Sequence, residues 1–224
     1  MTHEAAAELE AGLTKLRIPS AAAAKLLEFG ELVLAANLHT NLTGARNLAE
    51  IVRVHLLDSL APLKFVTLSS PIIDVGSGAG FPGIPAAIAF PDESFVLLEP
   101  RAKRAGFLES AASELALGNV SIVKSSAGGP GALPFLGKAG LVLMRAIARP
   151  DEAMILGLPL VRAGGALLLY EGRSGRATPE QRRTAKRLGG GEIEVREVAV
   201  PGLDAARHAW IVSKLRQPGK NAGH

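Results

Sequence analysis

Three glycines at alternate positions, Gly76, Gly78 and Gly80, follow a short apolar run and precede two prolines. The run Ile72–Val75 fits a buried strand, and proline suits the first turn of a helix, where its missing N–H is not needed. Glycines between a strand and a helix let the backbone approach a ligand closely and adopt dihedral angles that other residues disfavour. The stretch therefore predicts a binding loop for a small molecule.

The glycine spacing and the nearby acidic residues indicate which ligand the loop takes. The dinucleotide fingerprint G-x-G-x-x-G requires glycine where this chain has Phe81. Asp74 precedes the first glycine by two positions, and its carboxylate would repel a pyrophosphate but would suit an ammonium or sulfonium group. Glu99 follows the next apolar run, about 20 residues further on, where an acidic side chain can hold ribose hydroxyls. These features favour S-adenosylmethionine, and the cofactor-binding residues they predict are Asp74, Gly76, Ser77, Gly78, Gly80, Phe81 and Glu99.

Basic side chains gather in two parts of the sequence. The first contains Arg101, Lys103 and Arg104, and the second runs from residue 172 to residue 187, where Glu180 is the one acidic residue. The basic residues of the second part are Arg173, Arg176, Arg182, Arg183, Lys186 and Arg187. Solvated helix faces have a similar composition, but two such clusters beside a candidate cofactor loop indicate a polyanionic partner.

Hydrophobic periodicity predicts the elements that position these residues. Residues 5–16, 21–38 and 49–63 are predicted as helices, and His55 and Asp58 lie on one face of the third, where they would pack helices, form a lid on the cofactor or make a structural hydrogen bond. From residue 71 onward, apolar runs at 72–75, 95–98, 120–123, 141–144 and 166–170 alternate with helical segments at 82–89, 102–117 and 151–161. Such alternation predicts a parallel sheet with helices on both faces. Residues 192–200 and 207–215 have no helix between them and predict an antiparallel pair at the sheet edge.

The expected fold is thus α/β and Rossmann-like, with a mostly parallel seven-stranded sheet, an antiparallel edge strand and N-terminal helices. We divide the chain into an N-terminal helical extension at 1–68, a binding domain at 69–216 and a C-terminal tail at 217–224.

The composition of the 224-residue chain excludes several classes of site and protein. The chain has no cysteine, so disulfides, cysteine metal sites and cysteine nucleophiles are ruled out. Hydrophobic residues make up 48% and charged residues 21%, which is the balance of a globular protein. The N-terminus has no basic-then-apolar signal pattern, and the apolar runs are too short to span a membrane. We expect a cytoplasmic protein without a metal, because His55 and Asp58 offer too few ligands.

Seven motifs in this chain resemble the RsmG (GidB) family of methyltransferases, which methylate N7 of a guanine in 16S ribosomal RNA. They are Asn37-x-x-x-Asn41-Leu42-Thr43 with Arg46, His55-x-x-Asp58-Ser59, Asp74–Pro85, Leu97-Leu98-Glu99, Lys103-Arg104-x-x-Phe107-Leu108, Arg145-Ala146 and Arg207-His208. The first two are not general features of methyltransferases, and the motifs together cover most of the chain.

The resemblance implies a class I methyltransferase fold, S-adenosylmethionine as cofactor, and small-subunit ribosomal RNA or the 30S particle as partner of a monomeric enzyme. The cofactor contacts that it implies are Gly76, Phe81, Ala127, Gly128 and Arg145, and Arg145 is the candidate catalytic residue, which would orient the base or the methionine carboxylate. The residues then expected at the RNA are Lys103, Arg104, Arg173, Arg176 and Arg207, although Arg207 would equally suit a structural role. N7 of guanine carries a free lone pair at neutral pH, so the reaction needs positioning and exclusion of water but no general base.

The chain departs from the family pattern at several positions. Ser126 stands where arginine is usual, Gly128 replaces an acidic residue and Glu171 replaces a lysine. If the family's arginine and lysine hold RNA phosphates, Arg173 or Arg176 would substitute for them. Two alternatives follow from these departures: a methyltransferase of another RNA or of a small molecule, and an RNA-binding assembly factor that has lost catalysis. An NAD(P) oxidoreductase is disfavoured by the glycine spacing and by the lack of a Tyr/Lys pair for hydride transfer.

Overall fold

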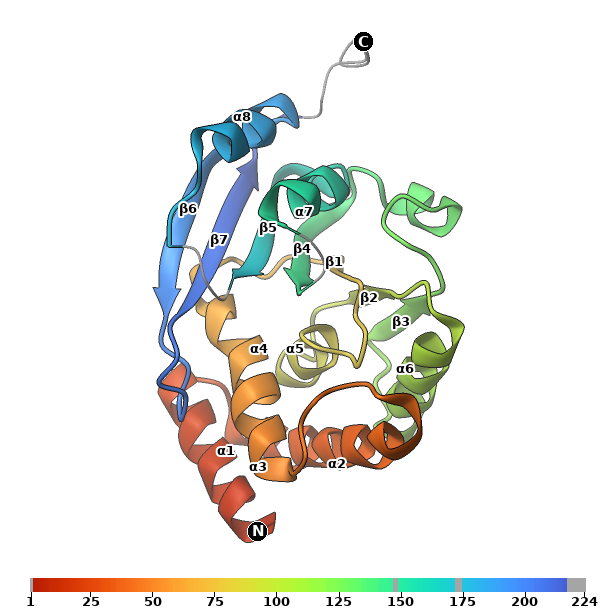
Figure 1. Ribbon diagram of the computed structural model, residues 1–224. Helices are drawn as coiled ribbons and strands as arrows, with labels where there is room; N and C mark the ends of the chain where they lie inside the picture. The colour runs from red at the N-terminus through yellow and green to blue at the C-terminus, as the bar shows by residue number, and fades with distance from the viewer. Residues whose placement is uncertain (1, 147–148, 172–174, 217–224) are drawn as a thin grey trace.

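Short apolar runs form the central strands, because a strand covered by helices on both faces has no polar side. The computed structural model describes residues 2–146, 149–171 and 175–216, and in this part of the chain seven strands form one sheet (Figure 1). The strands are β1 (Ile72–Val75), β2 (Phe95–Leu98), β3 (Val120–Val123), β4 (Ala139–Arg145), β5 (Val161–Glu171), β6 (Gly190–Val198) and β7 (Arg207–Lys214).

The strand order is β3-β2-β1-β4-β5-β7-β6, with β1 to β5 parallel and β7 antiparallel to both of its neighbours. The predicted seven-stranded, mostly parallel sheet is therefore confirmed. The short connection between β6 and β7 makes them an antiparallel pair, as predicted. The antiparallel strand itself is β7, which lies one position in from the edge, and β6 forms the edge.

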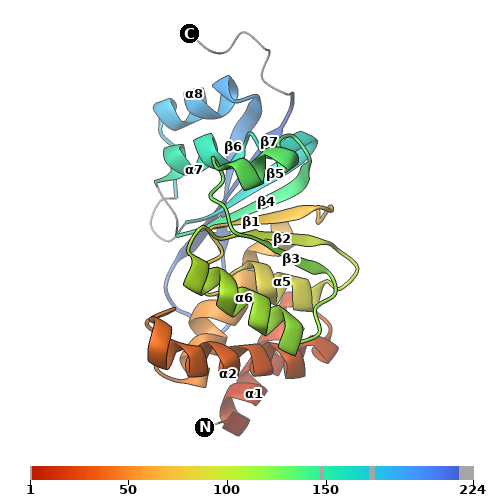
Figure 2. The ribbon, with the colours of Figure 1, turned by 90° about the vertical axis from the view of Figure 1, so that its right-hand side faces the viewer.

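Helices cover both faces of the sheet (Figure 2). The α-helices are α1 (Thr2–Leu16), α2 (Ala23–Thr40), α3 (Leu48–Glu50), α4 (Asp58–Leu60), α5 (Gly83–Ala89), α6 (Ala102–Glu114), α7 (Pro150–Gly157) and α8 (Pro179–Arg187). Three 3-10 segments, η1 (Ser20–Ala22), η3 (Ala61–Phe65) and η4 (Pro130–Phe135), and a π-helical segment, η2 (Ile51–Leu57), complete the helical elements of the described residues. Helix α8 was not predicted as a separate element, although Thr178 and Gln181 form a capping box at its start.

The helix predicted at 49–63 corresponds to a continuous helical stretch from α3 through η2 and α4 to η3. Its middle is π-helical over residues 51–57, which includes His55. Single π turns within α-helices are frequent at functional sites. Here the wide turn lies where the N-terminal helices face the carboxyl end of β4.

Two buried clusters lie on opposite faces of the sheet. Helices α5 and α6 share one cluster with the N-terminal helices, which contribute Phe29 and Leu56 to it, while α7 and α8 cover the other face together with Trp210. Alternate residues of β1 point to the two sides, with Ile72 in the first cluster and Ile73 in the second. The N-terminal helices therefore share a core with the sheet, and a separate N-terminal unit at 1–68 stays a prediction.

None of the helices within 2–146, 149–171 and 175–216 combines the length and the apolar character that a membrane crossing requires.

Candidate functional site

The glycine turn, defined as residues 76–80, joins β1 to α5 at the carboxyl ends of the parallel strands. Gly76, Gly78 and Gly80 have φ values of 70°, 59° and 95°, in the region that glycine adopts without steric cost. A Cβ on Gly80 would lie 3.0 Å from Phe29 Cζ and 3.1 Å from Leu108 Cδ2. The turn is thus packed directly on the helical layer, and its backbone path depends on glycine.

Two buried carboxylates hold the turn in place. Asp74 Oδ2 accepts a hydrogen bond from the backbone N–H of Gly83 at 3.0 Å, at the start of α5. Glu99 Oε2 accepts from Gly78 N at 2.9 Å, and its Oε1 accepts from Arg101 N at 2.8 Å. Both carboxylates therefore stabilise the strand–turn–helix connection that the sequence predicts as a binding loop.

Asp74 has an unusual environment for a carboxylate. Its side chain is only 1% exposed, and no described residue donates a hydrogen bond to the buried Oδ1. Burial raises the pKa of Asp74 to about 7, against the lowering effects of its hydrogen bonds and of the nearby Arg145 charge. A cationic group near Oδ1 would supply the missing partner and favour the ionised form.

The Asn37 and Thr43 side chains hold the loop after α2 against His55. Asn37 Nδ2 donates to Thr43 O at 2.8 Å, and Thr43 N donates back to Asn37 Oδ1 at 2.9 Å. Thr43 Oγ1 accepts from Ala45 N and is hydrogen-bonded to His55 Nε2 at 2.8 Å. Asn41 ends α2 in the left-handed conformation, which asparagine tolerates better than most residues.

His55 is a neutral histidine packed against an aromatic ring. Burial, followed by the Arg145 charge, lowers the pKa of His55 to about 4. Its ring stacks on Phe81 with centroids 4.7 Å apart, and Phe29 contacts Phe81 from another direction at 5.3 Å. Phe81 is only 8% exposed, so it forms part of the wall below the turn. A neutral imidazole that is hydrogen-bonded to Thr43 fixes both the loop and the ring.

Arg145, the last residue of β4, is bound by the helical stretch opposite it. Its Nη2 donates to Val54 O at 2.7 Å and pairs with Asp58 Oδ2 at 2.8 Å. Its Nη1 donates to Ser59 Oγ at 3.1 Å and to His55 O at 3.4 Å. These four acceptors match the four terminal N–H groups of the guanidinium, and among the described residues no acceptor is bonded to the Nε–H.

Asp58 joins Arg145 to the far part of the chain. Its Oδ1 lies 3.2 Å from Nε of Arg207, at the start of β7, while its Oδ2 pairs with Arg145. Tyr170, on β5, donates to the Ser59 carbonyl at 2.8 Å. The His-x-x-Asp-Ser motif thus links the helical stretch to three strands of the sheet, and a lid role for it stays a prediction.

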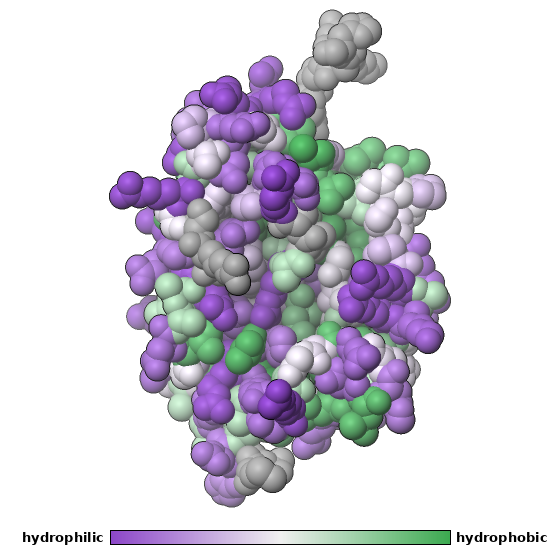
Figure 3. Space-filling view, viewed as in Figure 1, coloured by the Kyte–Doolittle hydropathy of each residue, from purple (hydrophilic) through white to green (hydrophobic). Residues whose placement is uncertain are grey.

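A cavity of about 240 Å³ opens beside the glycine turn. Figure 3 shows the same face hollowed near its centre, with hydrophilic side chains on both sides. The lining residues come from the loop after α2, η2, the glycine turn, α6 and the end of β4: Leu42, Thr43, Gly44, His55, Gly76, Ser77, Gly78, Ala79, Phe81, Arg104, Arg145 and Ala146. A second cavity of about 260 Å³ adjoins it, because Gly44 and His55 line both.

The structure divides the predicted cofactor residues into three groups. Those that line the cavity are Gly76, Ser77, Gly78, Phe81 and Arg145. Those that support the turn, without being among the lining residues, are Asp74, Gly80 and Glu99. Ala127 and Gly128 follow β3 in the loop at the same edge of the sheet and are outside the lining set.

The predicted RNA-binding residues lie in different surroundings. Arg104 lines the cavity, and Lys103 is exposed beside it at the start of α6. Arg207 is paired with Asp58, which favours the structural role left open above. Arg176 precedes α8, and Arg173 lies outside the described residues.

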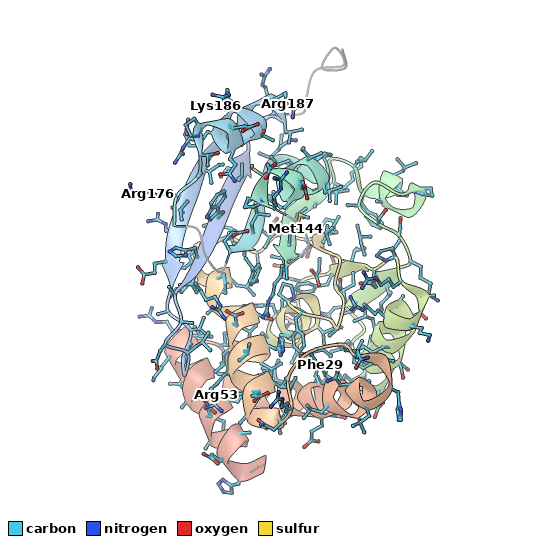
Figure 4. The ribbon with its side chains drawn as sticks, in the orientation of Figure 1. Phe29, Arg53, Met144, Arg176, Lys186 and Arg187 are labelled. Carbon is cyan, nitrogen blue, oxygen red and sulfur yellow. The ribbon has the colours of Figure 1, made fainter. Side chains whose placement is uncertain are left out.

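The basic residues of α8 lie away from the cavity. Figures 1 and 2 place α8 at the end of the molecule opposite the N-terminal helices, and Figure 4 shows Lys186 and Arg187 at this outer edge. Lys186 and Arg182 both pair with Glu192 on β6, at 2.6 Å and 3.4 Å. Part of the charge expected to face a polyanion is thus neutralised within the protein.

Sequence reasoning did not assign several cavity residues to the site. Leu42, Gly44, Ala79 and Ala146 line the cavity, yet only their positions within the family-like motifs indicated them. Within the described ranges, no three or more His, Asp and Glu residues lie close enough together to hold a metal ion.

Solved structures share the fold of this chain at low sequence identity. A methyltransferase from Pyrococcus furiosus is 15% identical, with a TM-score of 0.58, and the match covers 86% of this chain and 97% of that one. The cofactor-bound Rv0187 from MTB is 19% identical, with a TM-score of 0.57, and the match covers 85% and 91% of the two chains. These likenesses confirm the predicted fold class.

Sequence comparisons give a more specific result. A family model described as rRNA small subunit methyltransferase G matches residues 22–204. A protein named ribosomal RNA small subunit methyltransferase G from Azoarcus sp. is 37% identical over 199 residues, which cover 89% of this chain and 91% of the relative. A protein of the same name from Xanthomonas euvesicatoria pv. vesicatoria is 35% identical over 94% of this chain and 96% of the relative. Motifs, fold and comparisons agree that the chain belongs to the rRNA small subunit methyltransferase G (GidB) family.

Proposed function

We propose that this protein transfers the methyl group of S-adenosylmethionine to N7 of a guanine in small-subunit (16S) ribosomal RNA. The observation that carries the proposal is the cavity beside the glycine turn. Asp74 and Glu99 fix the position of the turn, and Arg145 is part of the cavity wall. Membership of the family supports ribosomal RNA as the substrate.

The residues at the cavity fit S-adenosylmethionine. The backbone of Gly76 and Gly78 lines the cavity and is accessible to a ligand. Asp74 lies behind this turn, and its charge would favour the cationic methionine part of the cofactor there. Glu99 keeps further acceptor capacity for ribose hydroxyls, because each carboxylate oxygen has two lone pairs. We place the adenine end toward Ala127 and Gly128 after β3. When bound, S-adenosylmethionine supplies a methyl group already activated by its positive sulfur.

The protein's part in this reaction is to position and enclose the reactants. N7 of guanine has an available lone pair, so no residue has to remove a proton first. His55 is neutral and hydrogen-bonded to Thr43, which suits it to shape the wall. The remaining Nε–H and the charge of Arg145 would orient the methionine carboxylate or the base. Holding the methyl donor and the guanine in line, in a site that excludes water, would accelerate the transfer without acid–base catalysis.

Phosphate contacts would come from the basic residues nearest to the cavity. Arg104 lines the cavity, and the exposed Lys103 precedes it on α6. Arg176 would add a contact nearer to α8, and we keep Arg173, which lies outside the described residues, as a further candidate. Arg207 would act chiefly through Asp58, since the two side chains are paired. We propose a monomer that acts on the 30S particle or on its RNA.

The test is methyl transfer from labelled S-adenosylmethionine to 30S particles from a strain that lacks this protein. N7-methylguanosine makes RNA cleavable by borohydride and aniline, so cleavage mapping identifies both the atom and the nucleotide. The proposal expects one new cleavage site in the small-subunit RNA. Label in another RNA, or cofactor binding by calorimetry without transfer to any RNA, would instead favour one of the two alternatives considered above.

A further inference from the structure

The second cavity, defined by its lining residues Gly44, Ala45, Glu50, Val54 and His55, has no role in the account above. It shares Gly44 and His55 with the cavity at the glycine turn, so the two spaces adjoin. Its volume of about 260 Å³ is sufficient for one purine base. Glu50 is the one acidic residue among the five.

The sheet order places this second cavity on the methyl-donor side of the cofactor. Glu99 directly follows β2, and the ribose expected there directs the adenosine half toward β2 and β3. His55 instead contacts Arg145 of β4, which lies on the other side of β1. A ligand in the second cavity would thus lie near the opposite end of the cofactor from its adenine.

Glu50 has the chemistry to recognise guanine. Its Oε2 accepts from Arg46 N at 2.7 Å, which fixes the carboxylate next to the loop after α2. The Watson–Crick edge of guanine presents two donors, N1–H and the N2 amino group, and a carboxylate is an acceptor-only group that can receive both. Adenine presents an acceptor at N1, which a carboxylate would repel. Guanine held by N1–H and N2 has N7 on its other, Hoogsteen edge, away from the carboxylate.

We propose that the second cavity binds the unstacked target guanine and that Glu50 selects it by accepting hydrogen bonds from its Watson–Crick edge. Enzymes that act on a nucleobase commonly read the extruded base in this manner. The proposal rests on the proposed function, since it names the subsite and the selecting residue of that same reaction. It makes Glu50 a specificity-determining residue that needs no part in binding the cofactor.

The experiment compares Glu50→Gln with the wild-type protein on 30S particles reconstituted with guanine or adenine at the mapped target. A glutamine keeps an acceptor for Arg46 N, but its amide also presents donors, which suit N1 of adenine. We expect the guanine-to-adenine ratio of kcat/KM to fall by about tenfold or more, the usual effect of one good base contact. Glu28→Gln, an exposed glutamate on α2, is the matched control and should keep the wild-type ratio.

Two further measurements separate the possible outcomes. Calorimetry should give the Glu50→Gln variant the wild-type Kd for S-adenosylmethionine, and Ala45→Leu, which fills the second cavity, should reduce transfer to guanine at an unchanged cofactor Kd. An unchanged guanine-to-adenine ratio in Glu50→Gln overturns the assignment, as does full activity of Ala45→Leu if the glutamine variant does not fold. Absence of guanine methylation by the wild-type protein would instead refute the proposed function itself.

Discussion

Replacing Asp58 with asparagine tests whether the link between β4, β7 and the helical stretch is as important as its geometry indicates. The Asp58 side chain is 7% exposed and pairs with Arg145 at 2.8 Å and with Arg207 at 3.2 Å. Asparagine has almost the same shape, so the change removes one negative charge between two guanidinium groups without opening a cavity.

The expected loss follows from the burial of the pair. Removing one partner of a buried ion pair costs about 3–5 kcal/mol, because a charge is left without compensation. Asparagine still offers one acceptor oxygen, and Arg145 keeps acceptors on Val54, His55 and Ser59. We therefore expect the free energy of unfolding to fall by about 2–3 kcal/mol, since a hydrogen bond to a charged group contributes about 1.5–3 kcal/mol.

Urea unfolding followed by circular dichroism measures this change, and calorimetry with S-adenosylmethionine should show a weaker Kd because Arg145 lines the cavity. The matched control is Glu109→Gln, which removes an exposed pair with Lys124 and should change stability by less than about 1 kcal/mol. The Asp58→Asn effect should persist in high salt, because buried pairs are poorly screened. A loss below about 0.5 kcal/mol, with an unchanged cofactor Kd, would show that this link is not what holds Arg145.

Three other expectations are open to direct measurement. In Gly83→Ala the new Cβ would lie 2.6 Å from Asp74 Oδ2, so thermal unfolding should show a loss of about 1–3 kcal/mol, while Gly118→Ala, which has no neighbour within 4 Å, should be close to neutral. Asp74 has a pKa of about 7 in the folded protein, above its ordinary value of 3.8, so it takes up its proton more readily when folded. The wild-type protein should therefore lose stability relative to Asp74→Asn as the pH rises from about 4 to about 7. Urea unfolding that gives the same difference in unfolding free energy between the two proteins at pH 5 and at pH 8 would refute this sign. Lys103→Ala should weaken RNA binding and lower the slope of log affinity against log salt by about 1, and an unchanged slope would exclude a phosphate contact.

Local sequence patterns were sufficient to predict most of the fold. The runs at 72–75, 95–98 and 120–123 coincide with β1, β2 and β3. β1 and β2 are buried along their whole length, and strands covered on both faces are mostly apolar, so they are visible as short apolar runs. Helix α8 was missed as an element, since a polar helix at the surface has little hydrophobic periodicity to show. The strand order could not be read in full either, because the insertion of β7 between β5 and β6 depends on contacts across about forty residues of sequence.

The site was predicted only in part. The glycine turn and its carboxylates are contiguous or nearly so in the sequence, and strand ends in a parallel sheet must meet at one edge, so residues 74–81 and Glu99 could be grouped in advance. The role of Arg145 could not be foreseen, because its four acceptors come from residues 54–59, about ninety positions earlier. Phe81 was expected to contact the cofactor and does line the cavity, but the packing of Phe29 and His55 against its ring could not be read from the sequence.

The sequence by itself determined the strand–turn–helix unit, the absence of cysteine chemistry and the family, since these depend on residue types at short spacing. Tertiary structure alone decided that Asp58 binds both Arg145 and Arg207, that Thr43 holds a neutral His55, and that a second cavity with Glu50 adjoins the first. The physical reason is that burial, protonation and cavity shape are set by atoms from distant segments, and a one-dimensional pattern contains no distances between them.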